Sequence, residues 1–178
     1  MKRIPWHPRM RHPGVARRLA ITGAAVLGLT VVAAVGMAAT SATPNGCPTD
    51  KSTKPAPISE LAPPARLQIV AFDVLSGPIN EQTQTFTLKV RVGSTCSGID
   101  IKGASVYVTA VPYNQFTIPD EELTGDDGTA TLVFRRDANF PASSKQQQLT
   151  LFIRATKPGE DPLAGVSTRR LVAIPFEG

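Results

Sequence analysis

Residues 84–92 of this 178-residue chain read QTFTLKVRV, and this stretch decides the fold class. Within it, apolar side chains alternate one by one with Thr, Lys and Arg, the apolar positions being Phe86, Leu88, Val90 and Val92. Successive side chains of a β-strand point to opposite faces, so this pattern predicts a strand with one buried face and one solvated face.

Five further segments have the same character, because they are short, rich in Val, Ile, Leu, Phe and Thr, and bounded by Gly, Pro or Asp. They are Leu67–Val74, Ser105–Val111, Thr129–Phe134, Gln148–Thr156 and Arg170–Phe176. This part of the chain shows no sustained helical periodicity with caps. We therefore expect residues 66–178 to form one all-β domain, an antiparallel Ig-like β-sandwich of about seven strands.

Two runs carry a family resemblance, CSGIDIKGASVYVTAV at residues 96–111 and TGDDGTATLVF at residues 124–134. They resemble bacterial Ig-like domains of the invasin and intimin repeat type, at Gly98, Ile101, Gly103, Val106, Val108, Thr124, Gly128 and Ala130. The resemblance implies a β-sandwich rather than a shared ligand. The transthyretin-like domains of carboxypeptidases use a similar turn, so the exact strand topology stays open.

The adjacent carboxylates of Asp126 and Asp127, followed by Gly128, have two interpretations. The first is a turn, in which Asp side chains accept backbone N–H groups and Gly128 takes a positive φ before the next strand. The second is a calcium site that also uses Asp120, Glu121 and Glu122, because calcium binds six to eight oxygens. The spacing does not match an EF-hand loop, so we predict the turn and no metal ion.

The positive charge of the chain is concentrated at its N-terminus. Six of the 19 Lys and Arg residues precede Leu19, and none of the 14 Asp and Glu residues does. The remainder is therefore close to neutral and has no basic stripe, which argues against a nucleic-acid partner. Residues 1–18 are predicted to be a basic leader that stays in the cytoplasm.

Residues 19–39 contain no charged side chain and are long enough for a hydrophobic helix across a bilayer. They fit either a retained transmembrane anchor or a signal segment cleaved near AATSA at residues 38–42. Either outcome exports the rest of the chain, to the outer side of the cell membrane or into the medium. Residues 40–65 are rich in Pro and are predicted to form an extended linker that contributes nothing to a core.

Cys47 and Cys96 are the only two cysteines. In an oxidising exported context an even pair indicates a disulfide, so we predict that these two residues are bonded.

The sequence argues against catalysis. The only histidines, His7 and His12, lie in the leader, so the exported part has no His to activate a nucleophile or to bind a metal ion. Glu121 or Glu122 with Asp126 or Asp127 leaves open a small carbohydrate-active enzyme. We expect no enzyme, no catalytic residue and no cofactor.

The most informative segment for binding is VPYNQFTIP at residues 111–119. Tyr113, Phe116 and Ile118 either contact a partner or plug the open end of the core, and the plug is the favoured interpretation. Arg169 and Arg170 either contact an acidic partner or, as favoured, pair with acidic side chains of the same domain. The expected role is non-catalytic binding or structure at the cell envelope, with a protein or polysaccharide partner. A calcium-dependent adhesive module is the alternative.

Overall fold

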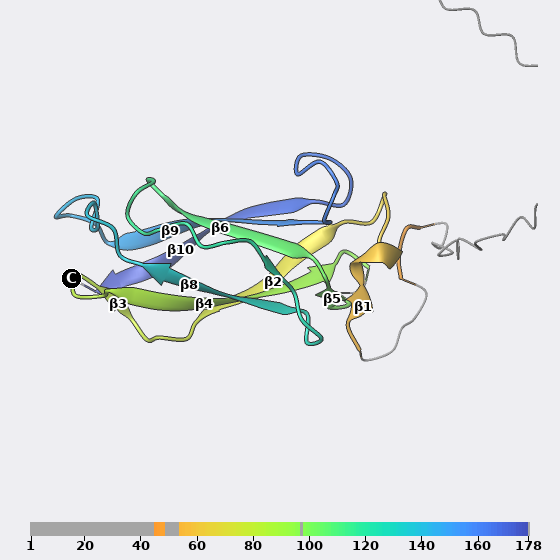
Figure 1. Ribbon diagram of the computed structural model, residues 1–178, viewed down its shortest axis with the longest axis horizontal. Coiled ribbons are helices and arrows are strands. Elements are labelled where there is room, and N and C mark those ends of the chain that lie inside the picture. The colour runs from red at the N-terminus through yellow and green to blue at the C-terminus, as the bar shows by residue number, and fades with distance from the viewer. Residues whose placement is uncertain (1–44, 49–53, 97, 178) are drawn as a thin grey trace, which may run out of the picture. The chain divides into compact units, whose positions relative to one another are not determined.

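A computed structural model of the chain describes residues 45–48, 54–96 and 98–177 (Figure 1). These residues form β1 (Ala56–Pro57), a 3-10 helix η1 (Ile58–Glu60), β2 (Leu67–Val74), β3 (Ile79–Asn80), β4 (Thr85–Ser94), β5 (Ile101–Lys102), β6 (Ser105–Val111), β7 (Glu122–Leu123), β8 (Thr129–Arg135), β9 (Gln148–Thr156) and β10 (Thr168–Glu177). The described part contains no α-helix, which confirms the all-β fold class.

The predicted leader at residues 1–18 and the hydrophobic helix at residues 19–39 lie outside the described residues. Within the described ranges, no helix is long and apolar enough to cross a membrane.

The strand predictions are confirmed, and β2, β6 and β9 have the predicted bounds. The other strands are longer than predicted because their ends depend on a pairing partner. Thus β10 begins at Thr168, which pairs with Ala155 of β9, and β4 runs to Ser94, which pairs with Leu67 of β2.

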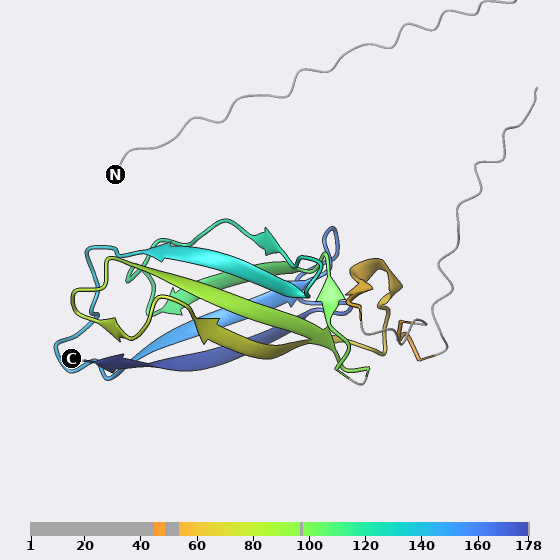
Figure 2. The ribbon, with the colours of Figure 1, turned by 90° about the horizontal axis from the view of Figure 1, so that it is seen from below.

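The strands form a five-stranded sheet in the order β3-β10-β9-β6-β7, a three-stranded sheet β2-β4-β8 and a two-stranded sheet β1-β5. The two larger sheets lie in two layers (Figure 1, Figure 2). Most pairings are antiparallel, as predicted, but β1 with β5 and β3 with β10 are short parallel pairings. β1 and β5 form their own two-stranded sheet, whereas β3 is the outermost strand of the five-stranded sheet.

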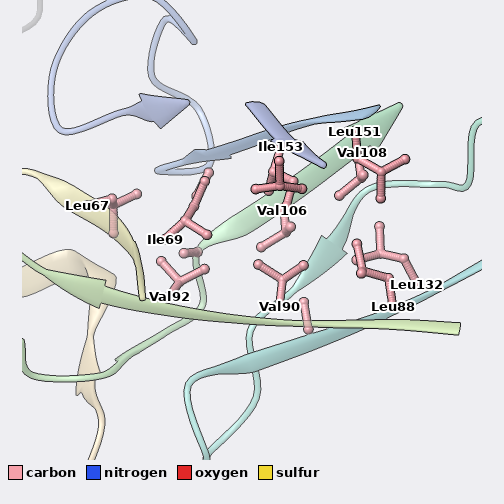
Figure 3. Close-up of a cluster of buried hydrophobic side chains, with 14 of the residues drawn as sticks. Leu67, Ile69, Leu88, Val90, Val92, Val106, Val108, Leu132, Leu151 and Ile153 are labelled. Carbon is pink, nitrogen blue, oxygen red and sulfur yellow. The ribbon is translucent and has the colours of Figure 1, made fainter. Parts of the chain in front are cut away.

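The core lies between the two larger sheets. Leu88, Val90 and Val92 of β4 point toward side chains of β6 and β9, among them Val106 and Ile153 (Figure 3). All five are fully buried. Burying each such side chain stabilises the fold by about 1.5–3 kcal/mol, so the alternation in residues 84–92 directly places the core.

The prediction that residues 40–65 contribute nothing to the core is wrong for residues 54–65. Ala56, Leu61 and Ala65 are buried in the core, and Leu61 is fully buried. The backbone N–H of Ala56 donates to the Asp100 carbonyl at 2.8 Å, where β1 pairs with β5. Proline favours extended backbone, and extended backbone can pair with a strand as well as span a linker.

Cys47 and Cys96 form a disulfide, which confirms that prediction. The bond links two residues that lie 49 positions apart in the sequence. Beside it, the N–H of Ala62 donates to the Gly46 carbonyl at 2.9 Å. Gly46 has a φ of +67°, and a Cβ there would lie 1.9 Å from the Ala62 carbonyl oxygen, so only glycine fits this contact. The disulfide and this contact hold residues 45–48 against the domain.

Candidate functional site

The Tyr113 loop, defined as residues 112–116 after β6, lies at the end of the domain opposite residues 45–48 (Figure 1, Figure 2). The Tyr113 side chain is 65 % exposed, and Asn114 has a φ of 67°. Asn is one of the few residue types that tolerate this left-handed backbone. The loop thus presents an aromatic side chain to solvent.

A buried glutamine holds the Tyr113 loop from the inside. Gln115 has no exposed surface, and its side-chain N–H donates to the Pro112 carbonyl at 3.0 Å. Its side-chain oxygen accepts from Gln146 Nε2 at 2.8 Å, and its carbonyl accepts from the Asp137 N–H at 2.9 Å. The amide of Gln115 therefore ties the loop to itself and to the segment between β8 and β9.

Phe116 anchors the other side of the loop. It is only 2 % exposed. Its ring lies edge-on to the ring of Phe86, with 4.9 Å between ring centroids, and tilted against the ring of Phe140, with 4.5 Å between centroids. The ring of Phe140 in turn lies edge-on to the ring of Phe176, with 5.4 Å between ring centroids. This aromatic cluster closes the end of the core, so Phe116 belongs to the core and is not an accessible contact for a partner.

The expected plug is thus confirmed for Phe116 but wrong for Tyr113 and Ile118, which are exposed. Ile118 is 52 % exposed and lines a shallow pocket of about 360 Å³ together with Val133 of β8. Tyr113 is not part of that pocket. The three residues proposed as one set therefore have separate environments. Gln115 was missed in the sequence, and its position between Asn114 and Phe116 gives no signal of burial.

Arg169 and Arg170 are the second and third residues of β10 and are both exposed. The Nη1 of Arg170 donates to the Ile69 carbonyl of β2 at 3.3 Å. Among the described residues, neither arginine forms an ion pair with an acidic side chain. The favoured expectation of surface pairing is therefore wrong for the described residues, and Arg170 contacts a backbone carbonyl instead.

The carboxylates considered for calcium or for catalysis are directed to different partners. Glu121 accepts from Ser105 Oγ at 2.5 Å and from Arg154 Nη2 at 2.8 Å. The Asp126 carboxylate pairs with Lys102 at 3.3 Å, and the Asp127 carboxylate pairs with Lys89 at 3.4 Å. In the described part of the chain, no group of three His, Cys, Asp or Glu side chains is arranged to hold a metal ion.

The turn predicted at Asp126, Asp127 and Gly128 is confirmed. Gly128 has a φ of +71°, and its N–H donates to the Gly125 carbonyl at 3.0 Å. The Asp127 carboxylate accepts from the Thr129 N–H at 3.0 Å and from the Thr129 hydroxyl at 2.7 Å. The hydrogen bond from the Thr129 hydroxyl is the main cause that lowers the pKa of Asp127 below its ordinary value. The bond from the Thr129 N–H contributes less, and Lys89 contributes least.

Comparisons of the chain with protein-family models, curated proteins and solved structures give no match. Of the five residues proposed from the sequence for an interaction, four are exposed: Tyr113, Ile118, Arg169 and Arg170. Tyr113 is the one whose loop is held in place by a buried polar side chain and by an aromatic cluster. The Tyr113 loop is therefore the candidate site.

Proposed function

We propose that this chain is an exported Ig-like β-sandwich that binds a partner or serves a structural role at the cell envelope without catalysis. The two layers of strands support the sandwich. The positions shared with bacterial Ig-like repeats also fit it, because Ile101 lies in β5, Val106 and Val108 lie in β6, and Gly128 closes the turn before β8.

The observation that carries the binding role is the exposed ring of Tyr113 on a loop held by Gln115. Aromatic side chains dominate interface energies because they bury a large area and have few rotatable bonds. A loop that already has one conformation loses less entropy on binding, so more of the contact energy appears as affinity. Both conditions are met at Tyr113, which would contact an envelope or extracellular protein or a polysaccharide.

The non-catalytic part of the proposal has two supports. Both histidines of the chain precede residue 45, in the leader. The Glu121 carboxylate is engaged by Ser105 and Arg154, while Asp127 is engaged by its own turn at Thr129. Paired carboxylates that act on a glycosidic bond have to face one shared space, and these two face different neighbours.

The proposal is tested by replacing Tyr113 with a photo-crosslinking amino acid in the full-length chain. The matched control carries the same amino acid at Leu163, which is 68 % exposed and lies in a different loop. Illumination of intact producing cells, followed by mass spectrometry, should identify an envelope protein or glycan attached at position 113 and absent at position 163. Wild-type chain without the photo-crosslinking amino acid should reduce the crosslinking at position 113 by competition. The Tyr113→Ser chain should not reduce it. Identical products at both positions would refute the binding role of the loop.

A further inference from the structure

Asparagine and glutamine side chains gather at the end of the domain that carries the Tyr113 loop. Residues 54–177 contain ten of them, and nine lie in three segments, residues 80–84, 112–116 and 137–148, whereas the tenth is Gln68 of β2. The nine are Asn80, Gln82, Gln84, Asn114, Gln115, Asn139, Gln146, Gln147 and Gln148. All three segments lie at the same end of the domain (Figure 1, Figure 2). Together they are named the amide end below.

Hydrogen bonds join the three segments of the amide end to one another. The N–H of Asp137 donates to the Gln115 carbonyl at 2.9 Å, and the Nε2 of Gln146 donates to the Gln115 Oε1 at 2.8 Å. The N–H of Arg136, one residue before the third segment, donates to the Gln84 carbonyl at 2.7 Å. The segments therefore form one connected surface, and a single extended ligand can contact all of them.

Most of these amide side chains face solvent. The exposed ones are Gln82, Gln84, Asn114, Asn139, Gln147 and Gln148. The Nε2 of Gln84 donates to the Gln82 carbonyl at 3.3 Å, and the other five side chains form no hydrogen bond with a described residue. Asparagine is common in turns because it bonds to nearby backbone, but glutamine has no such role. Turn formation therefore does not explain the four exposed glutamines.

The amide end carries little charge. Its three segments contain only Glu81, Asp137 and Lys145 as charged residues, so their summed charge is close to zero. A surface that recognises an anionic or cationic partner presents an excess of the opposite charge. This surface has no such excess, and its exposed polar groups are mainly neutral amides. Its polarity therefore favours a neutral polar ligand.

A single aromatic ring is exposed among these amides. Within residues 80–84, 112–116 and 137–148, Tyr113 is the only large apolar side chain that is exposed, because Phe116 and Phe140 are buried. The centre of a protein–protein interface is about 65 % apolar and combines several apolar or aromatic side chains. The amide end has no such group of side chains around Tyr113, which disfavours a protein partner.

One exposed ring and several neutral amides match the chemistry of a sugar chain. A sugar ring presents a face of C–H groups, and the electron-rich face of an aromatic side chain packs against it. The edge of the sugar ring carries hydroxyls. A side-chain amide has an acceptor oxygen beside a donor NH₂ group, so it accepts from one hydroxyl and donates to the next. A neutral sugar needs no charged group for either contact.

We propose that the amide end binds a neutral polysaccharide of the cell envelope. Tyr113 packs against one sugar ring, and exposed amides such as Asn139 and Gln147 form hydrogen bonds with hydroxyls of the same chain of sugars. Gln115 is buried and contributes by holding the Tyr113 loop in place. This inference rests on the proposed binding role of the Tyr113 loop and names the class of its partner, a glycan instead of a protein.

The test measures binding of the purified full-length chain, kept in detergent, to the envelope fraction of the producing cells. One sample of that fraction is digested with protease, and another is oxidised with periodate, which cleaves the vicinal diols of sugars. Binding should survive the protease and be lost after periodate. Raising the salt concentration from about 0.05 M to about 0.5 M should leave binding unchanged, because salt screens contacts between exposed charges and this contact uses none.

Two kinds of variant test the contacts. Tyr113→Phe should bind as the wild type does, because the ring makes the contact, whereas Tyr113→Ser should bind several-fold more weakly. The double variant Asn139→Ala with Gln147→Ala should also bind several-fold more weakly. The matched control is Gln68→Ala, which removes an exposed amide of β2 outside the amide end and should bind as the wild type does. All four side chains are exposed, so the variants should keep the wild-type melting temperature.

The outcomes separate this inference from the proposed binding role. Binding that survives periodate would overturn the inference. If protease removes that binding and Tyr113→Ser weakens it, the partner is a protein and the binding role of the loop stands. Loss of binding at high salt would assign a charged ligand and overturn the inference as well. Equal binding by the wild type, Tyr113→Ser and the double variant would overturn both the inference and the binding role.

Discussion

Gly128 packs directly against Asp100, so closely that a Cβ on Gly128 would lie 2.7 Å from the Asp100 Cβ. This approach brings the turn before β8 against the residue that precedes β5. Asp100 in turn lies 3.2 Å from Arg91 of β4 in an ion pair. Gly128 is therefore needed for two reasons, its left-handed backbone at φ +71° and the absence of a side chain at the contact.

Replacing Gly128 with Ala should destabilise the chain by more than the same change at Gly159. Both glycines have a positive φ, which costs about 1 kcal/mol or more for alanine, but a Cβ at Gly159 meets nothing within 4 Å. The excess at Gly128 then measures the collision with Asp100. Denaturant unfolding of the two variants checks this, and equal losses would show that the Asp100 contact adjusts without cost.

The Asp127 turn should make stability depend on pH in the acid range. The bonds from Thr129 lower the pKa of Asp127 below its ordinary value of 3.8. A lowered folded pKa gives stability that is present above about pH 3.8 and is lost as the pH falls through the folded value. Asp127→Asn should thus lower the melting temperature at pH 7, and this difference from the wild type should shrink as the pH falls below 3.8 and through the lowered pKa of Asp127.

The control for that experiment is Asp126→Asn, whose side chain is 95 % exposed and contacts Lys102. It should change the melting temperature much less than Asp127→Asn at pH 7. Calcium at millimolar concentration should leave the wild-type midpoint unchanged. A rise of several degrees that chelator reverses would replace the turn interpretation with a calcium site.

Leu61→Ala should destabilise the chain by about 2–5 kcal/mol, because it leaves a cavity where a fully buried side chain packs. The control Leu163→Ala removes a side chain that is 68 % exposed and should change stability by no more than about 0.5 kcal/mol. Chemical unfolding of both variants measures the difference. Equal and small effects would mean that residues 54–65 behave as the linker predicted from composition.

Gln115→Leu should cost about 1 kcal/mol, because it removes the hydrogen bonds that the buried Gln115 amide makes to the Pro112 carbonyl and to Gln146. The exposed neighbour Gln147→Leu is the control. Hydrogen exchange should also rise in residues 112–116 of the Gln115 variant and stay unchanged in the control. Unaltered exchange there would show that Phe116 alone holds the Tyr113 loop.

The strands and the turn could be predicted from local sequence, and the disulfide from the number of cysteines in the chain. Alternation from Phe86 to Val92 reports burial because neighbouring side chains of a strand point to opposite faces. Asp127 and Gly128 mark a turn because their conformational preferences act within a few residues. Cys47 and Cys96 were matched because the chain has no other cysteine.

Which residues are accessible was decided only by tertiary structure. Phe116 and Tyr113 are both aromatic and three positions apart, yet one packs on Phe86 and the other faces solvent. Leu61 lies in a Pro-rich segment and is buried because β1 pairs with β5, where Ala56 is the partner of Ile101 far along the chain. Arg170 meets the carbonyl of Ile69 across 101 positions of sequence. Burial and pairing depend on surfaces that residues far apart in the sequence create only when the sheets come together, and no local pattern contains that information.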